Sequence, residues 1–125
     1  MLQRISSGLL PVTLFLVAAC GSSSTGPSTP PDMVGDISIV RGAEFLTTAA
    51  FDPNPKTVGL ADGGGVRWVN GDNTTHQMMS DNGAFPTSDL IRPGETYSIT
   101  LRTAGTYHFH CAIHPNMVGT ITVTQ

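Results

Sequence analysis

The chain has 125 residues, of which 39% are hydrophobic and only 12% charged, and its net charge is −3. This length fits one small domain, and short alternating runs of apolar and β-branched residues favour an all-β sandwich over a helical bundle. From residue 20 onward, five Lys or Arg stand against nine Asp or Glu, and this mildly acidic balance argues against binding to nucleic acid.

The first 19 residues have the features of an export signal. Arg4 precedes an apolar stretch at residues 9–19, which is shorter than the roughly 20 residues that a membrane-spanning helix needs. Leu-Val-Ala-Ala-Cys at residues 16–20 is similar to a bacterial lipobox, whose cysteine becomes the lipidated first residue of the mature protein. The alternative is an ordinary cleaved signal with a chance cysteine. We therefore expect a lipoprotein signal peptide at 1–19 and a lipid on Cys20.

The segment after Cys20 is expected to be a disordered tether. Residues 21–31 contain only Gly, Ser, Thr and Pro, which offer nothing to bury. We expect residues 20–33 to hold a folded domain at 34–125 outside the cytoplasm, in the periplasm or another extracytoplasmic space. That domain is expected to be monomeric and anchored to a bacterial membrane through Cys20.

Seven or eight short strands separated by turns are predicted within residues 34–125, which suggests a Greek-key β-sandwich. The stretch between Phe45 and Phe51 lacks periodicity, and residues 51–55 cannot be a central strand because proline has no N–H to donate. Trp68 is expected to anchor the core. The predicted strands are residues 37–40, 56–60, 66–70, 77–80, 97–101, 107–111 and 118–123, with a short further strand possible within 84–91.

The strand at 107–111 has an informative alternation of side chains. If Tyr107 and Phe109 point into the core, Cys111 points inward with them, whereas His108 and His110 point outward. The two outward histidines are either solvated surface residues or part of a second metal site.

Three candidate metal ligands follow in the next loop. Cys111, His114 and Met117 have the spacing C-x2-H-x2-M, which places a thiolate, an imidazole and a thioether within seven residues. A site with two histidines, one cysteine and a weak axial methionine is the ligand set of a blue-copper electron-transfer centre. That set needs one more histidine, and His76 is the candidate because it follows the strand at 66–70.

Two other interpretations of Cys111 stay open at this point. Free cysteine is often a small buried core residue, and a cysteine with a nearby histidine can form a catalytic pair. The catalytic pair has less support, because no predicted helix is placed to lower the pKa of the thiol. We expect no disulfide between Cys20 and Cys111.

Four segments together resemble the cupredoxins of the plastocyanin and azurin family. They are F-D-P-N-P at 51–55, V-R-W-V-N-G-D-N-T-T-H at 66–76, L-I-R-P-G-E-T-Y-S-I-T-L at 90–101 and G-T-Y-H-F-H-C-A-I-H-P-N-M-V-G-T-I-T-V at 105–123. The loop from Cys111 to Met117 looks most like that of amicyanin. The resemblance implies a two-sheet sandwich and one copper ion per chain, with ligands at His76, Cys111, His114 and Met117.

The resemblance also implies reversible one-electron transfer between redox partner proteins rather than enzyme activity. Two alternatives are a copper carrier or buffer of the cell envelope, and a reductase with a second copper at His108 or His110. Many family members have asparagine after the first ligand histidine, where this chain has Gln77, and that asparagine ties the ligand loops together. The backbone around Asn70 and Gln77 is expected to donate hydrogen bonds to the cysteine sulfur.

Overall fold

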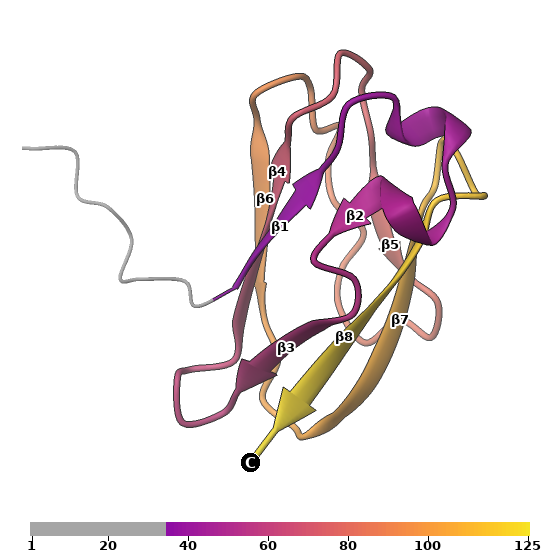
Figure 1. The fold of residues 1–125 in the computed structure, drawn as a ribbon. Coiled ribbons are helices and arrows are strands. Elements are labelled where there is room, and N and C mark those ends of the chain that lie inside the picture. Colours follow the sequence, from indigo (N-terminus) through magenta and orange to yellow (C-terminus); the bar gives the residue numbers. More distant parts are fainter. Residues whose placement is uncertain (1–34) are drawn as a thin grey trace, which may run out of the picture.

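The computed structural model describes residues 35–125, which form two four-stranded sheets packed face to face (Figure 1). The predicted all-β sandwich of seven or eight strands is therefore confirmed. The strands are β1 (Asp36–Ile39), β2 (Phe51–Asp52), β3 (Lys56–Gly59), β4 (Gly65–Asn70), β5 (Met78–Ser80), β6 (Thr96–Thr100), β7 (Gly105–Cys111) and β8 (Val118–Thr124).

The first sheet has the strand order β2-β1-β4-β6. Strands β1 and β4 run parallel, with Ile37 opposite Trp68, and β6 pairs antiparallel to β4, with Tyr97 opposite Trp68. The alternation predicted for residues 66–70 is confirmed, since Val66, Trp68 and Asn70 are buried while the residues between them are half-buried. Because β1 and β4 are parallel, the segments that follow them leave the sheet at the same end.

The second sheet has the strand order β3-β8-β7-β5 and carries the predicted ligand loop. Strands β7 and β8 are antiparallel neighbours joined by that loop, and Cys111, at the end of β7, lies opposite Met78 of β5. Phe109 and Cys111 are buried, whereas His108 is exposed and His110 half-exposed, as the alternation predicted. The thiol thus faces the space between the sheets.

Aromatic rings fill the centre of the sandwich. The ring of Trp68 lies 5.1 Å from that of Phe109 and 5.5 Å from that of Tyr97, measured between centroids, and Phe51 lies 4.8 Å from Phe109. Trp68 has no exposed surface, which confirms it as a core anchor. Such contacts between aromatic rings stabilise a core beyond the area they bury, and here they join the two sheets.

The irregular segment between β1 and β2 contains two 3-10 turns, η1 (Ala43–Phe45) and η2 (Thr48–Ala50). Strand β2 has only two residues and lies at the edge of its sheet, so the prediction that the proline-rich segment could not be a central strand is confirmed. In Figure 1 this segment lies at the same end of the sandwich as the loop between β7 and β8.

The predicted signal peptide, the lipid site at Cys20 and the tether at 20–33 lie outside the described residues. Within residues 35–125, no helix is long and apolar enough to cross a membrane.

Candidate metal centre

His76 is held at the end of the first sheet by a buried loop. The Asn70 side chain donates to the backbone carbonyls of Thr74 and Ile91, each at 2.8 Å, and accepts the Asp72 N–H at 2.9 Å. His76 then pairs with Ile91 through two backbone hydrogen bonds of 3.0 and 2.8 Å. The imidazole has no exposed surface, so its orientation is fixed by the surrounding protein.

Cys111 and the two residues that follow it in the motif form a tight loop. The Cys111 N–H donates to the Met117 carbonyl at 3.1 Å, and the Met117 N–H donates to the His114 carbonyl at 2.9 Å. Both Cys111 and Met117 are fully buried, while His114 is half-buried. Backbone hydrogen bonds therefore bring the two ends of the C-x2-H-x2-M motif together, and all three residues belong to one loop at one end of the sandwich.

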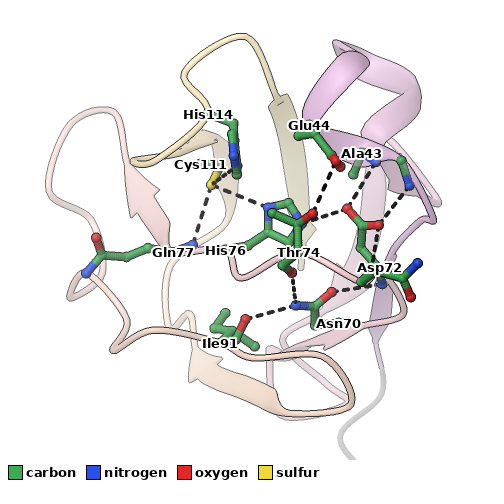
Figure 2. A network of polar contacts seen from close by, with 12 residues as sticks. Ala43, Glu44, Asn70, Asp72, Thr74, His76, Gln77, Ile91, Cys111 and His114 are labelled. Carbon is green, nitrogen blue, oxygen red and sulfur yellow. Dashed lines mark hydrogen bonds and ion pairs between the residues drawn. The ribbon is translucent and has the colours of Figure 1, made fainter.

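The thiol sulfur of Cys111 and one nitrogen of each imidazole form the three corners of a compact triangle (Figure 2). Cys111 Sγ is 3.7 Å from Nδ1 of His76 and 3.8 Å from Nδ1 of His114. Among residues 35–125, this is the only group of three or more His, Cys, Asp or Glu donors close enough to share an ion, and all its donor atoms lie within 4.8 Å of one another.

These separations fit one metal ion bound to all three atoms. Thiolate and imidazole ligands bind zinc at about 2.3 and 2.0 Å, and bonds of these lengths at a trigonal angle put sulfur and nitrogen about 3.7 Å apart. A trigonal set of two histidines and one cysteine is the preferred environment of blue copper. The arrangement therefore favours copper over metals that prefer hard oxygen ligands.

Local electrostatics hold Cys111 ready as a thiolate. Burial alone would raise the pKa of its thiol, but hydrogen bonds from His76 and from the Gln77 backbone outweigh that effect and lower the pKa from 9.0 to about 6. Burial would in turn lower the pKa of His76, and its contacts with Cys111 and Asp72 raise it. The thiolate and the imidazole thus stabilise each other's charged forms when no metal is bound.

Gln77 joins the two ligand loops through its backbone. Its N–H points at Cys111 Sγ at 3.4 Å, and its carbonyl accepts the Ala112 N–H at 2.8 Å. The Gln77 side chain instead donates to the Ser88 carbonyl at 2.9 Å. The expected hydrogen bond to sulfur is confirmed for Gln77, whereas the backbone N–H groups of residues 70–73 donate elsewhere.

His108 and His110 do not join this centre. They lie on the outer face of the second sheet, where His108 Nδ1 is 3.1 Å from the Thr120 hydroxyl and His110 Nδ1 is 2.6 Å from a carboxylate oxygen of Asp81. In the part of the chain that the structure describes, no third donor gathers with them.

Sequence reasoning missed Asp72, whose buried carboxylate contacts the other side of the His76 ring. Oδ2 of Asp72 lies 3.0 Å from His76 Nε2. Burial would raise the pKa of this carboxyl group, but N–H donors from Gly42 and Asn73 and the His76 ring lower it well below its usual range. The only signal in the sequence is an aspartate four residues before the histidine, in a loop where aspartate is also a common turn residue.

One family model and several curated proteins are similar to this chain in sequence. The family model described as "Cupredoxin-like domain" matches residues 14–123. A plastocyanin from Scenedesmus fuscus is 33% identical over 100 residues, which cover 70% of this chain and 99% of that protein. The chloroplastic plastocyanin of Physcomitrium patens is 35% identical over 82 residues, 56% of this chain and about half (49%) of that protein.

Solved structures share the fold. A purple cupredoxin from Nitrosopumilus maritimus superposes with a TM-score of 0.64 at 27% identity, covering 72% of this chain and 99% of the other. A mutant of amicyanin in its Cu(I) form superposes with a TM-score of 0.60 at 23% identity, covering 74% and 83%. The second likeness concerns the fold alone.

Proposed function

The chain belongs to the cupredoxin-like family, and we propose that it is a type-1 copper protein that transfers single electrons between redox partner proteins. The observation that carries the proposal is the triangle of donor atoms in which the buried Cys111 Sγ lies 3.7 Å from Nδ1 of His76 and 3.8 Å from Nδ1 of His114. One copper per chain fits this group of donors.

We assign the ligands as His76, Cys111, His114 and Met117. Copper, when bound, supplies the one-electron couple between Cu(I) and Cu(II). Cys111 contributes the thiolate, the two histidines bind as neutral imidazoles through Nδ1, and the buried Met117 is the candidate for the weak axial position. Because the hydrogen-bonded loops fix the three donor atoms grouped in the structure, little rearrangement is needed when an electron arrives or leaves.

His114 is the ligand through which we propose that electrons pass. It is half-buried, whereas His76 and Cys111 have no exposed surface. Its neighbours Ile113 and Pro115 are exposed, with 44% of Ile113 accessible. His114 is the only one of the three grouped ligands that reaches the surface, and these two residues form an apolar rim beside it. Such a rim suits docking of a redox partner.

The exposed Phe45 lies in a segment that contacts the ligand loop. The Asn116 side chain donates to the carbonyls of Glu44 and Leu46, the residues on either side of Phe45, at 3.1 and 2.7 Å. Phe45 is 83% exposed, which is unusual for a large aromatic side chain. We therefore include it with Ile113 in the docking surface.

The alternative of a copper carrier or buffer uses the same ligands but needs easy exchange of the ion. Here two of the three grouped donors are fully buried, and backbone hydrogen bonds close the loop around them. This enclosure supports slow exchange and hence an electron carrier. We also propose that the chain is not an enzyme, because His108 and His110 are engaged by Thr120 and Asp81 on a separate face.

The proposal includes the location expected from the sequence. Export by the signal at 1–19, a lipid on Cys20 and the tether at 20–33 would keep the domain at a membrane surface, where it could meet membrane-bound redox partners. Replacing Cys20 with alanine should release the protein from the membrane fraction without changing its copper spectrum. A protein that stays in the membrane fraction would contradict the lipid anchor.

The first test is the visible absorption and electron paramagnetic resonance spectrum of the mature protein loaded with one equivalent of Cu(II). We expect an intense blue or purple thiolate charge-transfer band, which Cys111→Ala should abolish and Cys20→Ala should leave intact. A pale spectrum that survives Cys111→Ala would mean binding by histidines alone and would contradict the proposed function.

A second test separates electron transfer from copper delivery. We expect fast electron self-exchange in stopped-flow or nuclear magnetic resonance measurements, together with slow loss of copper to a chelator. Ile113→Lys should slow electron exchange and keep the spectrum. Val118→Lys is the matched comparison, because Val118 is exposed but lies beside His110 on the outer face of the second sheet. Rapid loss of copper to the chelator would favour the carrier.

A further inference from the structure

We propose that Asp72 is a positioning residue of the copper centre, which fixes the tautomer and ring orientation of His76 and places a permanent negative charge behind that ligand. The inference rests on the proposed copper site and adds a residue to it that is not itself a ligand. Figure 2 shows the carboxylate on the far side of the His76 ring from Cys111.

The carboxylate of Asp72 is buried, and each of its two oxygens has two hydrogen-bond partners. Asp72 is 4% exposed and His76 is fully buried. Oδ1 accepts the N–H groups of Gly42 at 2.8 Å and Asn73 at 2.7 Å, while Oδ2 accepts the Ala43 N–H at 3.2 Å and contacts His76 Nε2 at 3.0 Å. Three backbone donors stabilise the ionised form, because an ionised carboxylate only accepts hydrogen bonds.

The tautomer of His76 follows from that arrangement. Opposite an ionised carboxylate, Nε2 has to carry the proton, and the neutral ring then has its lone pair on Nδ1. Nδ1 is the atom that faces Cys111 Sγ at 3.7 Å. Asp72 therefore presents His76 with the correct nitrogen free to bind metal, and a carboxylate behind a ligating histidine also makes the ring a stronger donor.

The two parallel strands of the first sheet build this contact. Asp72 follows β4, and Gly42 and Ala43 follow β1, which is the parallel neighbour of β4. Gly42 has a φ of 74°, a left-handed conformation that other residues adopt at a cost. That turn points two successive N–H groups at one spot, and such a concavity binds an anion. The nest of Gly42 and Ala43 thus orients Asp72, which in turn orients His76.

The charge has a consequence for the redox couple. Cu(II) carries one more positive charge than Cu(I), so a fixed anion behind one ligand stabilises the oxidised form more. The other ligand histidine, His114, has no carboxylate behind it in the described part of the chain. Within residues 35–125, the only side-chain hydrogen-bond contact of His114 is the one with Cys111. Loss of the Asp72 charge should therefore weaken Cu(II) binding relative to Cu(I) and raise the reduction potential.

The test compares Asp72→Asn with the wild type by redox titration of the copper-loaded protein. Mutation of the residue that hydrogen-bonds a metal-ligating histidine typically lowers metal affinity by about 10- to 100-fold. We expect at least a tenfold loss of Cu(II) affinity relative to Cu(I), and for one electron each tenfold change corresponds to about 59 mV. The thiolate charge-transfer band should remain, since all the proposed ligands are still present.

Asp81→Asn is the matched control. Asp81 also pairs with a histidine, at 2.6 Å from His110, but on the outer face of the sandwich and away from the grouped ligands. This variant should leave the potential close to that of the wild type. If the two variants raise the potential equally, the effect is one of overall charge and the role of Asp72 is overturned.

A second measurement does not depend on a variant that folds. Nitrogen-15 nuclear magnetic resonance of the diamagnetic Cu(I) protein should show His76 protonated at Nε2, with a slowly exchanging proton. A proton on Nδ1, or an unchanged potential in Asp72→Asn, would overturn the inference. A wild type that lacks the thiolate band would instead contradict the proposed function, so the two failures are distinguishable.

Discussion

Replacing Gly119 with alanine should disturb the packing of the two strands that carry the ligand loop. Gly119 on β8 lies opposite Phe109 on β7. A Cβ atom at position 119 would lie 2.2 Å from Cζ of Phe109, with two further ring carbons at 2.7 and 2.8 Å. Ordinary contacts are 3.4–4 Å, so the ring would have to move by about 1.2 Å.

The ring of Phe109 has little room for such a movement. It is 1% exposed, and it packs edge-on against Phe51 and Trp68 at centroid distances of 4.8 and 5.1 Å. Overpacking of a tight core costs about 1–3 kcal/mol. Because the ring is enclosed on both sides, we expect a loss near the upper end, about 2–3 kcal/mol, which lowers the urea midpoint by about 1 M.

Urea unfolding of the copper-free protein, followed by the fluorescence of Trp68, measures this loss. Phe109→Leu removes the ring carbons that would clash, so alanine at position 119 should cost much less in the double variant than in the wild type. The expected coupling is at least about 1 kcal/mol, within the range found for residues in contact. An unchanged midpoint for Gly119→Ala, or simple additivity in the double variant, would refute the steric argument.

Three further predictions concern charge and metal. Asp36 has a lowered pKa because Arg67 donates two hydrogen bonds to its carboxylate, at 2.9 and 2.6 Å. The stabilisation is therefore present above the unfolded pKa of about 3.9 and lost as the pH falls through the lowered folded pKa, so Asp36→Asn should lower the melting temperature at pH 7 by more than it does at acidic pH. In the copper-free protein, the ultraviolet absorbance of the Cys111 thiolate should rise with an apparent pKa of about 6, and His76→Ala should move that pKa upward. A depressed thiol pKa stabilises the folded state above the unfolded pKa, and this contribution falls as the pH is lowered from 9.0 to about 6. Removal of copper by a chelator should lower the melting temperature, since an ion at 1,000 times its Kd adds about 4 kcal/mol, and Cys111→Ala should lose most of this dependence.

Much of the fold could be predicted because its strands alternate. Val66, Trp68 and Asn70 face inward, and the same parity places Cys111 beside Phe109 in the core. Alternation reports which face of a strand is buried, but it does not report which strands pair. The parallel pairing of β1 with β4 was therefore not predicted, although it brings the segments after both strands to the metal centre.

The candidate ligands could be predicted from the sequence, whereas the role of Asp72 could not. Cys111, His114 and Met117 lie within seven residues, so their spacing alone brings them together. Asp72 acts through N–H groups of Gly42 and Ala43, about 30 residues away in the chain. Those donors are backbone groups in a segment without periodicity, and no residue type marks them in the sequence.

The metal centre takes its ligands from both sheets, so its geometry depends on how the two sheets pack in the core. His76 is fixed from the first sheet through Asp72 and Asn70, whereas Cys111 ends a strand of the second sheet. The separation of their donor atoms is therefore set by how the sheets pack, and interiors packed as densely as crystals resist small changes in that spacing. The backbone of Gln77 adds a direct link between the two halves. A centre built in this way keeps one ligand geometry because moving either ligand would mean moving a sheet, and that is the property that single-electron transfer requires of its protein.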